Sequence, residues 1–426
     1  MISINQEKND KIHELCNLPE GWQWKKLSEI ADTTSGGTPR RNQLEYFQGN
    51  INWFKSGELQ DAEIFESQEK ITLGAIKDSN AKVFPRGTLL IAMYGATAGK
   101  LGVLGVKAAT NQAICAVFPK KQFGLPLLNN WFLFYYFKSI RQQLINRSFG
   151  AVQPNISQRL IKETYIPIPF PKDIVLSLDI QNRIVARVES LLGELKGDHQ
   201  ILDKMHRDTS RFIDMKLEEI FEILQSARQP LMDVIESPPR NGWSPKCDNN
   251  PNGTPVLKLG AVLKFQYKPD EFKRTSLPTD PNAHYWLKPG DVLISRSNTF
   301  ELVGHAAIYS GTPFPCIYPD LMMRIRVDQS KADSRFLVYW LQSKEVRHFI
   351  QSRASGASPT MKKINQGHVC NIPFPVISLD EQRQLAHYLD SIQSEVNQML
   401  KTMQQDAKLL ERLEQAILEK AFQGQL

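Results

Sequence analysis

Two segments of the sequence place residue types where nucleotide or methyl-group chemistry could use them. Gly95 to Leu101 resembles a phosphate-binding loop, because glycines followed by a lysine can surround phosphates with backbone N–H groups. The spacing is one residue short of GxxxxGK[ST], however, and Leu101 stands where a hydroxyl should bind the metal ion. Asn371-Ile-Pro-Phe374 is similar to the NPPF motif of amino-methyltransferases but lacks its second proline, and its counterpart in the first half begins with Tyr165. We therefore predict neither ATP binding nor methyl transfer by this chain.

Metal-dependent chemistry is not indicated either. Pro269-Asp-Glu-Phe-Lys273 crowds its carboxylates too closely for the separated PD...ExK pattern of nucleases. The eight histidines form no HExxH or similar cluster. We predict no catalytic residue and no metal site, so the chain should bind and organise other molecules.

Basic, amide and aromatic residues in the connecting segments are suited to DNA. Arginine and lysine can bind phosphate or guanine O6/N7, and asparagine can make paired contacts to adenine. The candidate DNA-binding residues are Arg40, Arg41, Lys55, Ser56, Tyr94, Lys100, Lys258, Lys264, Lys268, Lys273, Arg274, Arg296, Ser297 and Asn298. For any one of them, plain solvent exposure is the more common explanation.

Length and composition bound the fold and the environment. A chain of 426 residues with 41% hydrophobic and 23% charged residues suits about two to four folded units. The net charge of +7 is compatible with a phosphate-backbone partner. The sequence has no apolar run long enough to span a membrane and no signal peptide, so we expect the cytoplasm. Its five cysteines form no CxxC pair and are expected to be ordinary thiols.

An internal repeat organises the chain. Ser177-Leu-Asp-Ile-Gln181 recurs as Ser378-Leu-Asp-Glu-Gln382, and the alignment continues without a gap to Phe221 and Phe422. Upstream, Ile168-Pro-Phe-Pro171 recurs as Ile372-Pro-Phe-Pro375, and Gly87, Gly150 and Pro154 have counterparts in Gly290, Gly356 and Pro359. A repeat with a period near half the chain predicts two similar domains.

The elements that must position the candidate residues are two globular modules, residues 18–175 and 227–376. Short β-rich runs such as Thr88–Met93 and Asp291–Ser295 alternate with turn residues. Each module also has one helix-like segment, at Leu127–Phe137 and Phe336–Phe349. We predict α+β modules, each with a strongly bent sheet and peripheral helices, after an N-terminal extension of residues 1–17.

Long helices are predicted over residues 176–226 and 377–426. Apolar residues step by three and four, as in an a/d heptad seam, with Asp198, Thr209 and Asp406 as polar interruptions. The expected packing residues are Ile184, Val188, Leu191, Leu195, Leu202, Met205, Leu385, Leu389, Ile392, Val396, Met403 and Leu410, and the stripes also take in Phe212 and Met399.

The two helices should pack together. A helix of about 45 residues rises roughly 65 Å and cannot bury its apolar stripe alone. If the halves are related by a pseudo-two-fold axis, the helices pair antiparallel and act as a spacer between the modules. The alternative is two separate dimerising coiled coils.

Several strings in order give the chain a family resemblance. The best-matching elements are Leu18-Pro-Glu-Gly-Trp22, Ser35-Gly-Gly-Thr-Pro39, Gly95 to Lys100, Thr110-Asn-Gln112, Gln153-Pro-Asn-Ile156 and Lys420 to Leu426. With the two modules and two long helices, the sequence resembles the specificity subunits of type I restriction-modification systems over nearly its whole length.

The resemblance implies two target-recognition domains, each reading one half of a bipartite site in double-stranded DNA. It also implies two modification subunits, which use S-adenosylmethionine to methylate adenine, and restriction subunits, which use ATP and magnesium. These cofactors would lie on the partner subunits and none on this chain. The helices would set the spacing of the half-sites and dock the modification subunits.

The second module departs from the family pattern. Ser295-Arg-Ser-Asn-Thr299 replaces the glycine-rich stretch, and Tyr318-Pro-Asp320 stands near the position of Thr110-Asn-Gln112. We therefore expect the two modules to read different half-sites, so that the target is not a palindrome. The competing hypotheses are a self-contained restriction or methylation enzyme fragment and a coiled-coil scaffold without DNA binding.

Overall fold

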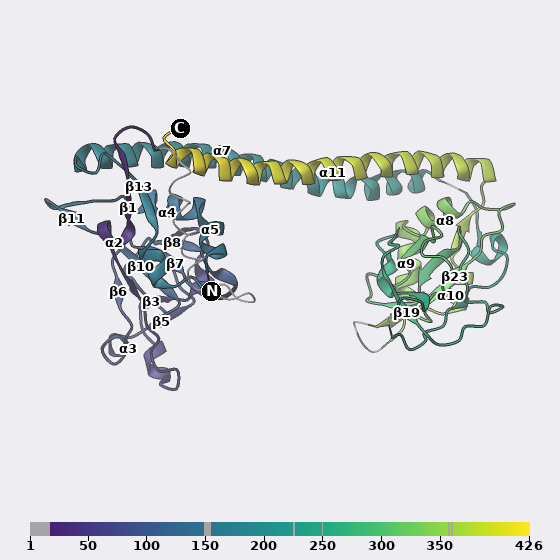
Figure 1. The fold of residues 1–426 in the computed structure, drawn as a ribbon. Coiled ribbons are helices and arrows are strands. Elements are labelled where there is room, and N and C mark those ends of the chain that lie inside the picture. Colours follow the sequence, from purple (N-terminus) through teal and green to yellow (C-terminus); the bar gives the residue numbers. More distant parts are fainter. Residues whose placement is uncertain (1–17, 149–154, 225, 249, 357, 359–360) are drawn as a thin grey trace. The chain divides into compact units, whose positions relative to one another are not determined.

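The computed structural model describes residues 18–148, 155–224, 226–248, 250–356, 358 and 361–426. The N-terminal extension and the segment containing Gly150 and Pro154 lie outside the described residues, as does Pro359. The chain forms two compact units, each described here by itself (Figure 1). Unit 1 comprises residues 1–202 and 405–426, and unit 2 comprises residues 203–404.

Unit 1 is built on a five-stranded sheet in the order β2-β10-β7-β8-β4, beside a four-stranded sheet in the order β5-β3-β9-β6. Its strands are β1 (Trp22–Lys26), β2 (Ala31–Ser35), β3 (Ile51–Phe54), β4 (Ala62–Ile64), β5 (Glu69–Ile71), β6 (Val83–Phe84), β7 (Leu89–Ala92), β8 (Leu101–Leu104), β9 (Ala108–Thr110), β10 (Ile114–Pro119), β11 (Lys121–Gln122), β12 (Leu125–Pro126) and β13 (Tyr165–Pro169). Its short helices are α2 (Leu27–Ile30), α3 (Leu73–Lys77), α4 (Asn130–Ser139), α5 (Arg141–Asn146) and α6 (Gln158–Lys162), with 3₁₀ turns η1 (Leu44–Phe47), η2 (Ser56–Glu58) and η3 (Gly95–Thr97).

The five-stranded sheet is buried on both faces. In β7, Leu89 and Ile91 belong to one core cluster, whereas Leu90 and Ala92 belong to another, because side chains alternate between the faces of a strand. Helix α4 lies against β7 and β8 (Figure 1). The expectation of one bent sheet per module is replaced in unit 1 by a five-stranded and a four-stranded sheet, with core clusters on both faces of the first.

Unit 2 repeats this plan with shorter strands. Its central sheet has the order β15-β23-β20-β22, which corresponds to β2-β10-β7-β8 of unit 1. Its strands are β14 (Arg228–Pro230), β15 (Arg240–Asn241), β16 (Thr254–Leu257), β17 (Val262–Leu263), β18 (Gln266–Tyr267), β19 (Phe272–Thr275), β20 (Val292–Ser295), β21 (Ser297–Asn298), β22 (Ala306–Ile308), β23 (Met322–Ile325), β24 (Lys362–Lys363) and β25 (Pro373–Pro375). Its short helices are α8 (Ser334–Trp340), α9 (Lys344–Arg353) and α10 (Gln366–Cys370), with 3₁₀ turns η4 (Leu231–Val234) and η5 (Leu259–Ala261). The predicted duplication of an α+β domain is confirmed.

The predicted module helices are placed correctly but bounded differently. Helix α4 begins at Asn130 because the side chain of Asn129 accepts hydrogen bonds from the next backbone N–H groups. The single helix expected over Phe336–Phe349 is two helices, α8 and α9. The hydroxyl of Ser343 accepts a hydrogen bond from the Val346 N–H and starts the second one.

Proline-marked strands close each module. Among the described strands, β13 pairs with β1 alone and β25 with β14 alone, so their prolines do not interrupt a larger sheet. The Pro373 carbonyl oxygen accepts a 2.6 Å hydrogen bond from Trp340 Nε1, and the Phe374 ring is fully buried. The segment that resembles a methyltransferase motif is therefore structural.

Two long helices complete the cores of both units. Helix α7 (Ile174–Ile223) begins in unit 1 and ends in unit 2, and α11 (Leu379–Phe422) begins in unit 2 and ends in unit 1. Val188 near the start of α7 and Phe422 at the end of α11 share the core cluster of unit 1. Phe221 at the end of α7 and Leu389 near the start of α11 share that of unit 2. Within each unit the two helices thus run in opposite directions, as predicted.

The buried face of these helices follows the predicted seam over most of its length and departs from it in α7 after Leu202 and at Met399 of α11. Of the expected packing residues, those at least partly buried are Ile184, Val188, Leu191, Leu195, Leu202, Leu385, Leu389, Ile392, Val396, Met403 and Leu410. Met205 is 47% exposed, and Phe212 and Met399 also point outward, whereas the expected interruption Thr209 is buried. The sequence allows both phases, because apolar residues occur in adjacent pairs such as Ile184-Val185, and the structure buries Val185 more deeply.

A buried glutamine fastens each long helix to its module. Gln181 accepts a 2.8 Å hydrogen bond from the Asn129 N–H and donates to the Leu127 carbonyl. Gln382 accepts from the Asp333 N–H at 3.1 Å and donates to the Lys331 carbonyl at 3.1 Å. Both side chains are almost fully buried. These contacts explain why the repeated Ser-Leu-Asp-x-Gln string ends in glutamine.

We expect Gln382→Met to destabilise unit 2 by about 2 to 3 kcal/mol, because it removes the hydrogen bonds of an almost fully buried amide to the Asp333 N–H and the Lys331 carbonyl. Denaturant unfolding followed by tryptophan fluorescence measures the change. The matched control is Gln384→Met, since Gln384 is exposed on the same helix. Equal stabilities for the two variants would contradict this role of Gln382.

Candidate nucleic-acid interface

One end of the five-stranded sheet gathers the candidate loops of unit 1. Strands β2 and β7 end there and β10 begins there, because β10 is antiparallel to both neighbours. The loop after β2 carries Arg40 and Arg41, and the loop between β7 and β8 carries Tyr94 and Lys100. The Asn111 N–H donates to the Phe54 carbonyl, which brings the end of β3 to the same place. The topology therefore brings all six candidate residues of unit 1 to loops around one sheet end.

Glycines hold the loop after β2 tightly against the sheet. A Cβ on Gly36 would lie 2.2 Å from the Thr110 carbonyl oxygen, so a side chain there would displace the loop. The Gly37 N–H donates a 2.9 Å hydrogen bond to the same carbonyl oxygen. Beyond them, the Thr38 hydroxyl donates to Oε1 of the exposed Gln112 side chain.

Two of the candidate cations share one carboxylate. Glu69 accepts hydrogen bonds from Lys55 Nζ at 2.7 Å and from Arg41, and the Arg41 guanidinium lies over the Trp53 ring at 4.9 Å. The hydrogen bond from Lys55, then that from Arg41, lowers the pKa of Glu69 against the opposing effect of its partial burial. Ser56 follows as the first residue of η2. Arg41 and Lys55 are thus held in place but carry only one net positive charge with Glu69.

The resemblance of Gly95–Lys100 to a phosphate loop is not structural. The segment forms the 3₁₀ turn η3 and leads into strand β8, whereas a phosphate loop leads into a helix whose N-terminus faces the phosphates. Instead, the Arg141 side chain donates to the Gly99 carbonyl and pairs with Asp61. Tyr94 and Lys100 remain at the surface as exposed and partly exposed side chains.

Unit 2 has an equivalent sheet end, and its first loop, Gly242–Pro245, carries none of the candidate residues. The Trp243 N–H donates a 2.9 Å hydrogen bond to the Tyr318 carbonyl oxygen, as Gly37 does to Thr110. A Cβ on Gly242 would lie 1.9 Å from that oxygen. The Ser244 hydroxyl then donates to the exposed Asp320 carboxylate, as Thr38 does to Gln112. A short pattern recurs at Gly36–Pro39 and Gly242–Pro245: a glycine, any residue, a hydroxyl residue and a proline. This recurrence is the sequence signal that could have identified Ser244.

Arg296, Ser297 and Asn298 follow β20 at this sheet end. The Arg296 guanidinium donates to the Asp320 carbonyl at 3.4 Å. Asn298 is partly buried and accepts a hydrogen bond from the Thr299 N–H. Ser297 is only 3% exposed, because the pairing of β21 with β24 covers it, and this corrects its prediction as a DNA contact.

The remaining cations of unit 2 are divided between two ribbons. Lys264 and Lys268 lie at opposite ends of the hairpin β17–β18, so the structure does not bring them together. Lys258 and Lys273 are exposed on or beside the ribbon β16–β19, where Lys258 pairs with Glu271 at 3.5 Å. The side chain of Arg274 instead contacts residues of the ribbon β16–β19 and of the turn before it.

That arginine has a structural role. Its guanidinium donates to the Gly253 carbonyl at 2.8 Å and lies over the Phe272 ring at 5.3 Å. Lys258 and Glu271 repeat the pairing of Lys55 with Glu69 at the corresponding place in the fold. Each unit therefore presents, beside the loops of its sheet end, a lysine whose charge is partly neutralised by a glutamate.

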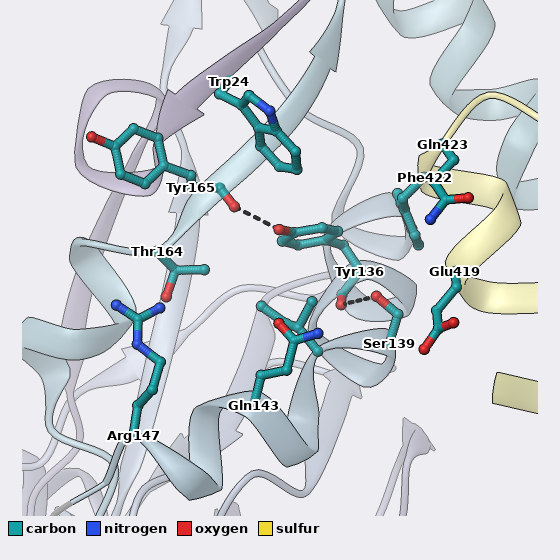
Figure 2. Close-up of a pocket in the computed structure, with 11 residues that line it drawn as sticks. Trp24, Tyr136, Ser139, Gln143, Arg147, Thr164, Tyr165, Glu419, Phe422 and Gln423 are labelled. Atoms are coloured by element: carbon teal, nitrogen blue, oxygen red, sulfur yellow. Dashed lines mark hydrogen bonds between the residues drawn. The ribbon is translucent and has the colours of Figure 1, made fainter. Parts of the chain in front are cut away.

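An apolar pocket recurs where a long helix ends against its module. In unit 1 the last turn of α11 meets α4 and α5, with Phe422, Trp24 and Tyr136 in the lining (Figure 2). The Tyr136 hydroxyl donates to the Tyr165 carbonyl, and the Ser139 hydroxyl to the Tyr136 carbonyl (Figure 2). In unit 2 the last turn of α7 meets α8 and α9 in a pocket with corresponding lining. The Tyr136 and Ser139 hydroxyl groups thus bind backbone carbonyls.

Other chemical features of the described chain are few. In the described ranges, no three histidine, cysteine, aspartate or glutamate side chains are grouped so that they could hold a metal ion. The helices that the structure describes include none with the length and apolar character of a membrane span.

His305 supports the hairpin that carries Lys264. Its Nδ1 atom accepts a 3.1 Å hydrogen bond from the Lys264 N–H, and its ring lies 4.5 Å from the Phe265 ring, centroid to centroid. Burial, then the nearby charge of Arg347, lowers the pKa of His305 to about 4. The ring is therefore neutral in the folded protein at neutral pH.

The lowered pKa makes stability depend on pH. Between the ordinary histidine pKa of about 6.5 and the folded-state value of about 4, the unfolded chain binds a proton that the folded chain does not. Stability is thus full above pH 6.5 and falls by roughly 3 kcal/mol as the pH drops to 4. We expect the His305→Gln variant to lack this pH-dependent loss of stability. The measurement is the free energy of unfolding of the variant and of the unchanged chain between pH 4 and pH 6.5, compared at each pH. Parallel curves would contradict it.

The comparisons with known proteins agree with the repeat. A family model described as "Type I restriction modification DNA specificity domain" matches residues 19–204 and again residues 214–408. The chain is 25% identical to the type I restriction enzyme StySPI specificity subunit of Salmonella potsdam and 24% identical to the EcoKI specificity subunit of Escherichia coli K12. Each match covers 96% of this chain and 90% of the relative.

Other similarities are partial or concern the fold. A match to the MjaIX specificity subunit of Methanocaldococcus jannaschii, at 25% identity, covers 62% of this chain and 57% of that protein. Among solved structures, a chain from a study of the assembly and conformational transition of the type I restriction-modification system superimposes with a TM-score of 0.74 at 23% identity, over 96% of this chain and 100% of that one. The HsdS subunit from Thermoanaerobacter tengcongensis gives 0.58 at 22% identity, with coverages of 96% and 98%.

Proposed function

Because the chain belongs to the family of type I restriction-modification DNA specificity domains, with two copies of the domain, we propose that it is the specificity subunit that selects the DNA target of such a complex. The observation that carries the proposal is the coincidence of the two family matches with two units that have the same polar, cation-bearing sheet end. Each unit reads one half of a bipartite target. The scaffold alternative leaves this duplicated surface without a purpose.

The two halves of the target differ. The sheet end of unit 1 presents Gln112, whereas that of unit 2 presents Asp320, an amide against a carboxylate. Groups with different hydrogen-bonding capacity select different base edges. Exchanging residues 227–376 for the corresponding segment of another specificity subunit should therefore change only one half of the target.

Affinity comes from phosphate contacts around the sheet ends. Arg41 and Lys55 are already ordered by Glu69 and by aromatic packing, so binding DNA costs them little side-chain entropy. The sheet-end candidates other than the buried Ser297 supply phosphate or base contacts, as do the exposed cations of the second unit. Catalysis, with its S-adenosylmethionine, ATP and magnesium, belongs to partner subunits.

We expect the double change Arg41→Ala and Lys55→Ala to weaken DNA binding. It should also reduce the magnitude of the negative slope of log affinity against log salt by about 1 to 2, since each phosphate neutralised contributes about 0.9 to that slope. Fluorescence anisotropy over a salt series measures the slope. The control is Lys172→Ala, because exposed Lys172 lies before α7 and away from the sheet end. An unchanged slope in the double variant, with the protein folded, would remove these residues from the interface.

The long helices hold the spacing of the half-sites and dock modification subunits. Met205, Phe212 and Met215 lie on one face of α7 and are 47%, 41% and 62% exposed. Their spacing of seven and three residues forms an apolar stripe separate from the buried seam. Exposed apolar stripes of this kind suit a partner helix. We propose that the stripe receives a helix of a modification subunit.

We expect Phe212→Glu to reduce capture of the cognate modification subunit at least tenfold while leaving the melting temperature nearly unchanged, because it buries a charge only in the complex. Analytical size exclusion of the mixed subunits measures capture. Ser210→Glu adds the same charge to another exposed face and serves as the control. Equal capture by both variants would place the docking surface elsewhere.

A further inference from the structure

The two sheet ends hold one pair of side chains in equivalent places. In unit 1 the Gly36 N–H donates to the carbonyl of Ile114, the first residue of β10. In unit 2 the Gly242 N–H donates to the carbonyl of Met322, the first residue of β23, at the same distance of 3.3 Å. The backbone from each glycine to the hydroxyl residue two positions later is thus fastened in the same way. The residues that this hydroxyl contacts are therefore structurally equivalent.

Those residues are Gln112 and Asp320. Both side chains are exposed, and each has one oxygen held by the neighbouring hydroxyl, Thr38 in unit 1 and Ser244 in unit 2. The Ser244 oxygen also accepts a 3.1 Å hydrogen bond from the Asp320 N–H, so that backbone and side chain are both fixed. An exposed polar group held in one conformation loses little entropy when it binds a further partner.

The surroundings of the Asp320 carboxylate restrict the groups of DNA that it could bind. It lies beside the Arg296 guanidinium, which donates to the Asp320 backbone carbonyl, on a surface that should face phosphates. A carboxylate there is repelled by phosphate, so it contributes to binding only where it accepts a hydrogen bond from a base amino group. Asp and Glu accept from cytosine N4, whereas Gln makes a two-bond contact to adenine N6 and N7.

We propose that Gln112 and Asp320 are equivalent specificity-determining residues of the two units, with Gln112 selecting adenine and Asp320 selecting cytosine. The proposal rests on the proposed function and adds the base that each unit prefers at one position. It also gives a local chemical reason for an asymmetric target. Thr38 and Ser244 act as positioning residues, since they hold the reading groups without contacting a base.

The test exchanges the chemistry of each reading group but keeps the oxygen that its hydroxyl neighbour contacts. Asp320→Asn and Gln112→Glu both retain such an oxygen, so the loops should keep their conformation. Each variant is assembled with its modification subunits and used to select binders from a random double-stranded DNA library. We expect Asp320→Asn to change the preferred base at one position of one half-site from cytosine to adenine, by about 10-fold or more.

Gln112→Glu should make the opposite change, from adenine to cytosine, in the other half-site only. Ser244→Ala should weaken selection at the Asp320 position without changing the preferred base. Asp270→Asn removes the same charge from another exposed position of unit 2 and should leave the selected sequence unchanged.

The possible outcomes distinguish failure of the base assignment from failure of the proposed function. If the unchanged complex selects no sequence, the proposed function fails and the base assignment fails with it. If the unchanged complex selects a bipartite sequence but Asp320→Asn and Gln112→Glu select the same one, the proposed function stands. Gln112 and Asp320 then only fasten their loops, and the base assignment is overturned.

Discussion

The structure depends on the burial of one face of each long helix in the cores of the modules. A helix of this length with a single apolar stripe is unstable alone in water, because its stripe stays hydrated. Here Val185 and Val188 of α7 join Leu418 and Phe422 of α11 in the core of unit 1. Different parts of the same helices complete the core of unit 2. The modules and the helices therefore stabilise one another.

This constraint also explains where the buried polar groups are. Gln181 and Gln382 lie near the starts of α7 and α11, and each almost fully buried side chain binds backbone groups of its module. At one end of each module sheet, loops present charged and amide side chains.

The recognition end combines close backbone packing with exposed polar side chains. Gly36 and Gly242 let the first loop approach the carbonyls of Thr110 and Tyr318, which no larger residue would allow. The loops that follow are fixed by hydroxyl contacts and by cations paired with Glu69 or Glu271. If these loops bind DNA as proposed, they are arranged before it binds, and their partial internal neutralisation moderates the attraction to phosphate.

The sequence by itself determined the duplication and the two long helices, because repeated strings and apolar periodicity can be recognised from the order of the residues alone. The sequence also predicted which loops of unit 1 carry the candidate residues. Only the tertiary structure decided which phase of adjacent apolar pairs is buried, turning Met205 outward and Thr209 inward. It likewise buried Ser297 in a strand paired with β24 and set Ser244 beside Asp320, two residues 76 positions apart. These outcomes depend on contacts between distant segments, which the periodicity of a single segment does not contain.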